Sequence, residues 1–465
     1  MSINSSELPS VFLAPLASAE PAVAAPASLC AATAKRKREA LPPLALFSAL
    51  GGQEPVTPLL VRSVALLPRT ETLPKSEEGA TPLPSERKRS RKPVCLSLVD
   101  TSTAAETEYL TSSITLLTPE KASREFDLAR EALLSGDLTP AGQGKNGAFF
   151  LRSGGLSPVA VVKPKEHELG GSRSAYQKFD ILCSKVGLAP EEGAPTECLA
   201  FLAASKYEGK FKVPTTVYGR VIAKGFVPGS TAFLERTAAI QQFIPGTTMF
   251  KDCSAERLSA LSPSNVHHVG IFDIIFFNTD RNSSNLLVAE DGELWLIDNG
   301  CLLPRKITSE SAGVFCWKQL PQTQAAFSEE TKAFIRSLTP NSLQEALSCL
   351  SSIPELSEVT FRDRYTVHML GVELLKQGAE KDLSLFEIAS FCQAKDKYDT
   401  PLLGEILGQA LADTSARPLE DKIKKAVSYT MEEYVKAKGL FLKKDSSLTS
   451  TTVCDQVITA LKATI

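Results

Sequence analysis

The sequence lacks the features that mark several special classes of protein. It has no run of about 18 consecutive apolar residues, so no transmembrane helix is expected. Its ten cysteines are scattered without a C-x-x-C pair, which argues against a zinc site and a disulfide framework. The 51 lysines and arginines are balanced by 53 aspartates and glutamates, so there is no basic field for nucleic acid. These absences favour a globular protein of a reducing compartment that does not bind nucleic acid.

Residues 1–110 differ in composition from the rest of the 465-residue chain. Nearly half of the 29 prolines fall in this part, and its apolar residues follow neither a helical nor a strand period. Both features predict a disordered tail. Two basic clusters, at 35–38 and 87–92, interrupt it. They are interpreted as solvated linker charge, as an address signal or as a contact with an anionic membrane surface.

From about residue 111 the sequence predicts a small α+β lobe, which is followed by a mostly helical part. Apolar periodicity, glycines and β-branched residues define the expected elements. The expected helices cover 119–134 and 195–205, and a turn and strand cover 142–151, with further strands at 158–163, 213–218 and 238–243. Near the C-terminus, one helical face is assigned to Ile423, Val427, Tyr434 and Val435.

The strongest local pattern is an aspartate and an asparagine in the spacing D-x-x-x-x-N, at Asp280 and Asn285. Kinase catalytic loops carry this spacing. Asp298 follows in Asp-Asn-Gly, at the place where kinases carry a metal-binding Asp-Phe-Gly. The three residues together predict the centre of a phosphotransferase.

Turn chemistry supports this centre independently. The dipeptide Asp291-Gly292 lies between two apolar runs and predicts a two-residue type I′ hairpin turn. Such a turn pairs the two flanking glutamates and, further out, places Asn285 opposite Asp298. Facing Cβ atoms lie about 5 Å apart, a distance that lets two oxygen ligands hold one Mg²⁺. The alternative is an ordinary hairpin with a polar end.

A glycine-rich turn, Gly142–Gly147, precedes a strand that ends at Lys163. The backbone N–H groups of such a turn can approach phosphates, and the Lys163 ammonium can reach the α- and β-phosphates of a nucleotide. A hairpin turn and an edge lysine are common by themselves, but these lie about 120 residues before the catalytic-loop pattern, in kinase order. Glu197, on the helix between them, is the candidate partner of Lys163, with a solvated helix residue as the alternative.

Two further stretches have predicted roles. The residues that end the last expected strand of the small lobe are candidates for a hinge with backbone contacts to adenine: Gln242, Phe243 and Ile244. The pair His267-His268 suggests a metal or a general base, but adjacent residues of a helix point about 100° apart. A structural role is therefore expected for both histidines.

These motifs resemble the phosphatidylinositol 3-/4-kinase superfamily, and most closely its type II 4-kinases and plant gamma-type enzymes. The resemblance covers roughly residues 112–400. It is carried by 149–152 with 161–165, 266–274 running into 278–281, 297–300, 317–322 with 327–331, and 374–379. It implies an α+β, two-lobed protein-kinase-like fold, with the N-lobe at 111–246 and the C-lobe at 247–465.

The resemblance also implies the cofactors ATP and Mg²⁺ and a role for individual residues. Lys163 is expected to bind ATP phosphate, and Asp280 to orient or deprotonate the acceptor hydroxyl. The expected Mg²⁺ ligands are Asn285 and Asp298. Two glycines are expected to lie over the phosphates: Gly144 and Gly147.

The sequence departs from these families in three places. The cysteine-rich palmitoylation run of animal type II enzymes is missing, and Cys183 stands alone. The ubiquitin-like domain of plant gamma enzymes is not evident. The stretch after Gly300 carries only two nearby cations, Arg305 and Lys306, which is a sparse set for reading an inositol phosphate headgroup.

Three functions remain open from the sequence. The first is transfer of the ATP γ-phosphate to an inositol hydroxyl of phosphatidylinositol. The second is a Ser/Thr protein kinase with the same site, and the third is a degenerate nucleotide-binding scaffold. The expected partners are ATP, phosphatidylinositol or a protein hydroxyl, and an anionic membrane at its periphery. A cytoplasmic or peripheral-membrane location is expected, and a bacterial protein exported into a host cell is a further interpretation.

Overall fold

The computed structural model describes the chain within the compact unit 100–465. The described residues are 113–116, 124–135, 138–142, 147–153, 157–167, 187–350, 353, 358–395 and 399–463. The tail predicted for residues 1–110 lies outside them, as do Gly144 and Cys183. The predictions for these parts therefore stay predictions.

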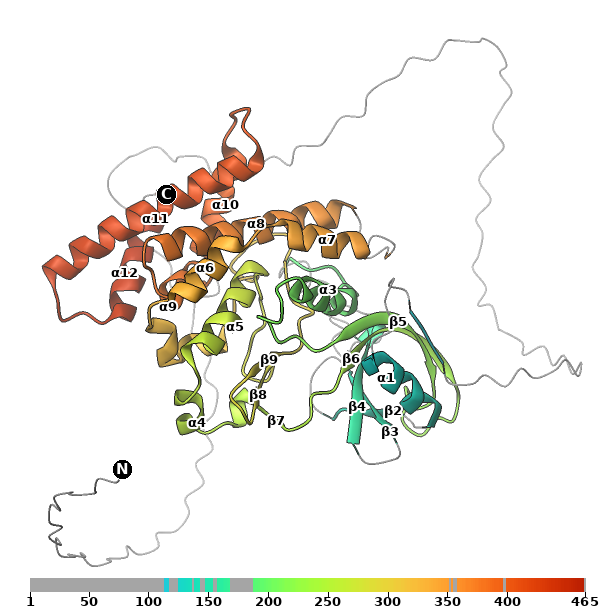
Figure 1. The fold of residues 1–465 in the computed structure, drawn as a ribbon. Helices are drawn as coiled ribbons and strands as arrows, with labels where there is room; N and C mark the ends of the chain where they lie inside the picture. The colour runs from blue at the N-terminus through green and yellow to red at the C-terminus, as the bar shows by residue number, and fades with distance from the viewer. Residues whose placement is uncertain are drawn as a thin grey trace, which may run out of the picture. The chain divides into compact units, whose positions relative to one another are not determined.

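The first part of the fold is an antiparallel six-stranded sheet in the order β1-β5-β6-β4-β3-β2. One face of it packs against α1, through small and apolar residues such as Ala129, Ala132 and Leu133 (Figure 1). The elements are β1 (Ser113–Leu116), α1 (Arg124–Ser135), β2 (Leu138–Pro140), β3 (Phe149–Ser153), β4 (Ser157–Pro164), β5 (Thr216–Ala223) and β6 (Leu234–Gln242).

One helix, α3 (Gly193–Ser205), connects this sheet to the rest of the fold. It follows the short 3-10 helix η1 (Lys165–His167) in the order of described elements. It contacts β5 and β6 on one side and α7 on the other. Its sequence is apolar around most of its circumference because both sides are covered, so Glu197 is buried among Ala194, Cys198 and Leu199.

A second sheet has three short strands in the order β7-β8-β9 and begins the helical part of the fold. Its strands are β7 (Thr247–Met249), β8 (Leu286–Ala289) and β9 (Leu294–Leu296), and the elements between them are η3 (Phe250–Asp252), α4 (Ala255–Ser259) and α5 (Pro263–Ile275). In Figure 1 this sheet lies between the first sheet and the helices.

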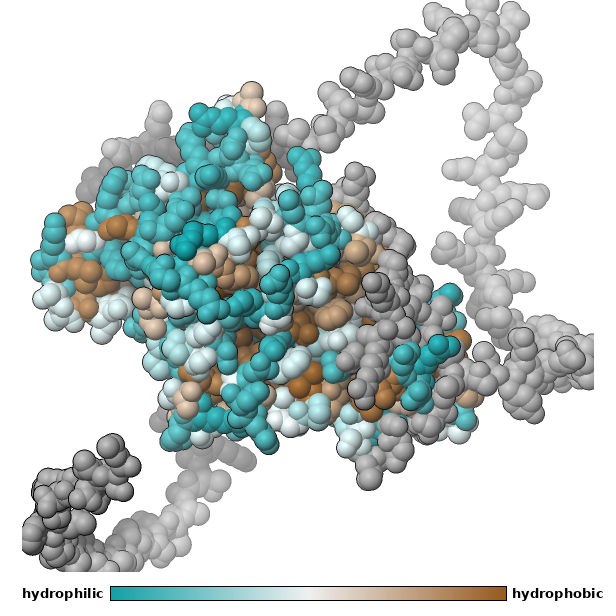
Figure 2. Space-filling view, in the orientation of Figure 1, coloured by the Kyte–Doolittle hydropathy of each residue, from teal (hydrophilic) through white to brown (hydrophobic). Residues whose placement is uncertain are grey.

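The remaining helices pack around α5 and α8 in one large hydrophobic core. They are η4 (Cys316–Gln319), η5 (Pro321–Gln324), α6 (Glu329–Ser337), α7 (Asn341–Cys349), α8 (Glu358–Glu380), α9 (Leu385–Phe391), α10 (Leu402–Ala412), α11 (Leu419–Lys444) and α12 (Ser450–Lys462). Polar side chains cover most of the face in Figure 2, and apolar ones gather at the far end of α11, where Leu440 and Leu442 are exposed. In the described part of the chain, no helix combines the length and apolarity needed to cross a membrane.

The predicted α+β, two-lobed fold is confirmed, whereas the lobe boundary at 246/247 stays a prediction. Three local predictions need correction. The strand predicted for 238–243 begins four residues earlier, at Leu234, and ends at Gln242. The strand predicted from Val213 begins instead at Thr216, after Pro214, because proline has no N–H for a sheet ladder. Val435 is 39% exposed rather than buried, since it follows the buried Tyr434 directly and successive helical residues point about 100° apart.

Candidate active site

A cleft of about 390 Å³ lies where the two sheets meet. Strand β4 supplies Val161 and Lys163 to its lining, and the segment after β9 supplies Asp298. Its apolar walls fit a flat aromatic ring. Those walls include Phe150, Val161, Phe243, Ile244, Met249, Leu287 and Ile297.

At the inner end of the cleft, Lys163 contacts two carboxylates. Its Nζ donates to Glu197 Oε1, and it lies 3.1 Å from Asp298 Oδ1. Gln241 Nε2 donates to the other Glu197 oxygen at 3.2 Å and to Thr216 Oγ1 at 3.1 Å. The predicted partnership of Lys163 and Glu197 is thus present as a contact, and Glu197 is held from two sides.

The charges of this group stabilise each other. Burial works against the Lys163 charge, but Asp298 and Glu197 outweigh it, so the pKa of Lys163 lies above its ordinary value. The Lys163 ammonium in turn holds the pKa of Asp298 below its usual range. Both groups therefore stay charged near neutral pH.

The loop after α5 holds the predicted catalytic residues. Asp280 accepts hydrogen bonds from Asn282 Nδ2 at 3.0 Å and from Asn285 Nδ2 at 3.3 Å. Its backbone N–H donates to Asn278 Oδ1 at 2.8 Å. Burial raises the pKa of Asp280, and the nearby Asp298 raises it further, although Asn282 and Asn285 stabilise the charged form. Asp280 and Asn285 are therefore brought together as their spacing predicts.

Arg281 holds this loop in place through buried contacts, and the sequence prediction assigned it no role. Its side chain is fully buried, and its Nε lies 3.1 Å from both oxygens of Asp273 on α5. Its Nη1 donates to the carbonyls of Asn285 and Ile297, and its Nη2 to Asn299 Oδ1 at 2.6 Å. One guanidinium thus joins the Asp280 loop to the segment that carries Asp298.

Asp273 is the centre of this buried network. It also accepts hydrogen bonds from Trp317 Nε1 at 2.8 Å and from Asn278 Nδ2 at 3.0 Å. A buried carboxylate needs such partners because it has lost its water. The signal in the sequence was Asp273 inside the apolar run 269–277, where a charged side chain is rarely found unless paired. Arg281 stands among polar residues and gave no such signal.

The predicted register of the β8–β9 hairpin is wrong by one residue. Leu286 pairs with Leu296, and Ala289 N–H donates to Glu293 O, so the loop holds three residues instead of two. Only Gly292 in this loop has a positive φ, 82°, whereas a type I′ turn needs two such residues. Asn285 therefore lies opposite Ile297, whose N–H donates to Asn285 O, and not opposite Asp298.

Asp298 nevertheless lines the same cleft as Asn285. The φ of Asp298 is 54°, in the left-handed region that residues other than glycine, asparagine and aspartate rarely adopt. The chain thus changes direction at Asp298 and leaves the alternation of β9. This turn of the backbone offsets the one-residue register shift, which the strand rules alone could not foresee.

The predicted hinge lines the cleft, but its residues differ in what they can offer. The N–H groups of Gln242 and Phe243 already donate to Thr215 O at 2.8 Å and to Val159 O at 3.0 Å. Within the described part of the chain, the N–H of Ile244 has no hydrogen-bond partner. Ile244 is therefore the hinge residue whose N–H is free to contact an adenine.

Two more positions complete the description of the cleft. Gly147 has a φ of 56° and ends the turn between β2 and β3, next to Ala148 in the cleft lining. Lys251, on η3, lines the cleft and was not predicted. Its N–H donates to Ser283 O at 3.0 Å, and its ammonium makes no ion pair with any described residue.

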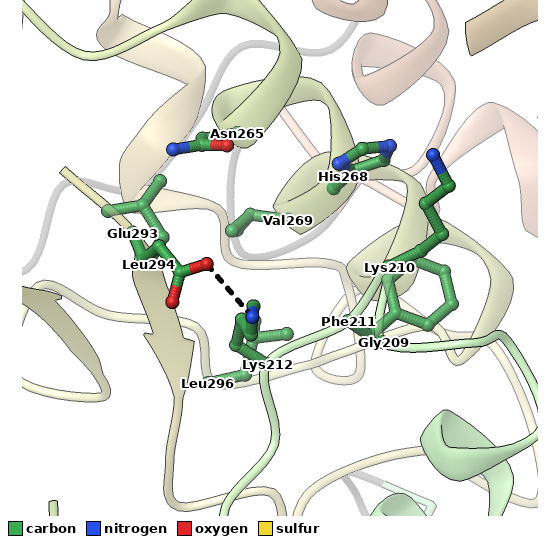
Figure 3. A pocket seen from close by; sticks show the side chains of 10 residues that line it. All are labelled: Gly209, Lys210, Phe211, Lys212, Asn265, His268, Val269, Glu293, Leu294 and Leu296. Carbon is green, nitrogen blue, oxygen red and sulfur yellow. Dashed lines mark ion pairs between the residues drawn. The ribbon is translucent and has the colours of Figure 1, made fainter. Parts of the chain in front are cut away.

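The two adjacent histidines lie away from the cleft. His267 is buried, contacts Gln322 O at 3.0 Å and packs against Phe327, as a structural residue does. His268 lines a separate hollow of about 200 Å³, next to Lys210 (Figure 3). Burial lowers the pKa of His268 to about 4, so its ring is neutral near pH 7. The two rings do not share one site.

The fold places Lys163 of a β-rich lobe next to Asp298 of a helical lobe, and it places the loop with Asp280 and Asn285 beside them. This arrangement is consistent with a two-lobed kinase-like fold. Comparison with known proteins specifies the class further. Residues 183–354 match the family model described as "Phosphatidylinositol 3- and 4-kinase". The predicted resemblance to this superfamily is thereby confirmed.

Curated relatives are named as phosphatidylinositol 4-kinases of the gamma type. Phosphatidylinositol 4-kinase gamma 5 of Arabidopsis thaliana is 29% identical over 273 residues, which are 54% of this chain and 41% of the relative. Phosphatidylinositol 4-kinase gamma 3 of the same plant is 26% identical over 310 residues, 62% of this chain and 52% of the relative. Phosphatidylinositol 4-kinase gamma 4 of Oryza sativa subsp. japonica is 28% identical over 281 residues, which are 56% of this chain and 46% of the relative. The chain thus spans about half the length of these relatives.

Proposed function

We propose that this chain is an ATP- and Mg²⁺-dependent kinase that transfers the ATP γ-phosphate to an inositol hydroxyl of phosphatidylinositol. The observation that carries the proposal is the position of Lys163 in contact with both Glu197 and Asp298 inside one cleft. Kinases need this lysine–glutamate pair and the metal-binding aspartate in place at the same time. The names of the relatives support phosphatidylinositol as the acceptor.

The geometry of the cleft supports a role for each of its polar groups. Lys163 would bind the α- and β-phosphates, and the N–H of Ile244 would contact adenine. Asp280 would accept the proton of the attacking hydroxyl as its oxygen bonds to the γ-phosphorus and ADP leaves. Lys251, which lines the same cleft, would add a second positive charge at the phosphates or at the acceptor.

The residues of the cleft also fit Mg²⁺. Hydrogen bonds to Asp280 occupy the Nδ2 of Asn285, which leaves its amide oxygen for a cation. Asp298 offers a carboxylate in the same cleft. Among the described residues no group of three His, Cys, Asp or Glu side chains could hold a metal alone, so phosphate oxygens would complete the site. The ion would neutralise the phosphates.

The choice of acceptor is tested by radiolabelled ATP offered in parallel to phosphatidylinositol vesicles and to a panel of proteins. We expect labelled lipid that depends on Mg²⁺ and is lost in Asp280→Ala. Labelled protein without labelled lipid would establish the alternative, a protein kinase with the same site. Nucleotide binding without any transfer would establish a degenerate scaffold.

The location of the protein is proposed separately. We propose that it works in the cytoplasm or at the periphery of a membrane, with the basic clusters at 35–38 and 87–92 in contact with anionic lipid. Each lysine or arginine near such a surface contributes about 1 kcal/mol. Export from a bacterium into a host cell remains a proposal about the tail, tested by fractionation of infected cells.

A further inference from the structure

The start of α3 is tied to the segment that follows Asp298. Glu192, just before the helix, is only 1% exposed. Its carboxylate accepts hydrogen bonds from Arg305 Nη2, from Arg364 Nη2 at 3.3 Å and from Ala189 N at 2.9 Å. Three separate parts of the chain therefore meet at one buried carboxylate.

The two arginines differ in position and exposure. Arg364 lies on α8, its side chain is fully buried, and its Nη1 approaches Leu302 O at 3.4 Å. Arg305 lies on the segment after Asp298, and its side chain is 38% exposed. Arg364 thus balances the charge of Glu192 within the core, while Arg305 connects Glu192 to the segment that follows Asp298.

A second contact joins the same two segments. A Cβ added to Gly300 would lie 3.2 Å from the Cα of Gly193, so the two backbones touch. Gly300 follows Asp298 by two positions, and Gly193 is the first residue of α3. The helix start is therefore fixed on both sides, by this backbone contact and by the Glu192–Arg305 pair.

We propose that Arg305, through Glu192, is a positioning residue that keeps Glu197 against Lys163; this rests on the proposed kinase function. Glu192 and Glu197 are five residues apart, and a helix transmits a shift at its start over this distance of about 7.5 Å. If α3 moves away, Lys163 loses Glu197 and keeps Asp298 as its remaining carboxylate partner. Lys163 then competes with Mg²⁺ for Asp298, which lowers kcat and raises the Mg²⁺ concentration that the reaction needs.

The test compares Arg305→Ala with Arg305→Lys and a matched control, Arg220→Ala, in the full chain. Arg220 forms an exposed ion pair with Glu235 on the first sheet, outside the cleft. We expect Arg305→Ala to lower kcat about 10- to 100-fold, as a misplacement near 1 Å does, with a smaller change in the KM for ATP. The Mg²⁺ concentration for half-maximal rate should rise, Arg305→Lys should recover part of kcat, and Arg220→Ala should match the parent.

A measurement that needs no activity completes the test. Hydrogen exchange of the α3 amides should be faster in Arg305→Ala than in the parent, and unchanged in Arg220→Ala. Parental exchange together with parental kcat in Arg305→Ala would overturn the proposal. So would a loss of kcat that only follows the unfolded fraction, because the residue would then be structural. If the parent transfers no phosphate to any acceptor, the proposed function fails, while the exchange comparison still decides whether Arg305 holds α3.

Discussion

Lys163 Nζ lies 3.1 Å from Asp298 Oδ1, although 135 positions separate the two residues in the chain. Lys163 belongs to the β-rich lobe and Asp298 to the helical lobe, so their contact connects the two lobes. Because Lys163 is the proposed phosphate ligand and Asp298 a proposed metal ligand, this contact joins the two proposed sites. Glu197 binds the same ammonium.

The first prediction concerns the charged groups themselves. Lys163→Ala, Asp280→Ala and Asp298→Ala should each lower phosphotransfer about 100- to 1000-fold or more, because each removes a charge from the transition state. Melting curves should show folded protein in all three. Asp298→Asn is the matched control, since asparagine also tolerates a left-handed φ and separates loss of charge from backbone strain. Near-full activity of Asp298→Ala with Mg²⁺ would make the site assignment wrong.

The second prediction concerns pH. A general base works only when deprotonated, and burial raises the pKa of Asp280, so the rate should rise with pH through that pKa. Lys163 and Asp298 have pKa values shifted toward their charged forms, so they should not produce this limb. Asn282→Ala removes a donor to the charged form and should move the limb to higher pH.

The pH profile has a control in the same loop. Ser283→Ala changes a neighbour without a described contact to Asp280, so its profile should match the parent. An acidic limb that stays in place in Asn282→Ala would remove Asp280 from the role of base.

The third prediction concerns stability. Arg281→Ala leaves Asp273 buried without its cation and should lower the free energy of unfolding by about 3–5 kcal/mol. The exposed pair Arg220–Glu235 is the matched comparison, and Arg220→Ala should cost less than about 1 kcal/mol. Denaturant unfolding measures both. Equal effects would mean that the buried network does not stabilise the fold.

The fourth prediction concerns Lys251, whose ammonium has no ion-pair partner among the described residues. Lys251→Ala should raise the KM for ATP about 3- to 10-fold, the effect of losing one charged contact to phosphate. Added salt should weaken ATP binding by the parent more than by the variant. Lys224→Ala, an exposed lysine outside the cleft, should change neither quantity. An unchanged KM would place Lys251 outside the nucleotide site.

The fifth prediction concerns the first 105 residues. Their deletion should preserve phosphotransfer to dispersed substrate and reduce binding to anionic vesicles. Limited proteolysis checks the premise, because a disordered tail is cleaved far faster than a folded lobe. A tail as resistant as the rest of the chain would reveal a folded domain.

Sequence reasoning reached the elements and the residues with local signals. The spacing of Asp280 and Asn285 predicted that they lie together, and the helix of Glu197 was expected at 195–205, close to its observed bounds Gly193–Ser205. It failed where geometry is not local. A turn with Asp-Gly fits a two-residue loop and a three-residue loop, and only packing selects between them.

The contacts of Arg281 and Glu192 show the same limit. Asp273 lies eight positions from Arg281, whereas Arg305 lies 113 positions from Glu192. At either separation, no periodicity marks which buried carboxylate a given arginine will meet. The sequence shows the charge but not the partner. Such contacts follow from the packing of α3, α5 and α8, which one sequence does not specify by pattern alone.

The chain has two tryptophans, and both belong to the framework of the site. Trp317 is fully buried, with its indole N–H donating to Asp273, and Trp295 lies in β9, the strand that leads to Asp298. Tryptophan emission of the native protein, excited above the tyrosine band, therefore comes from these two places without any added label. A change in the emission wavelength on addition of ATP or denaturant therefore reports on the surroundings of Asp273 and of β9 in particular.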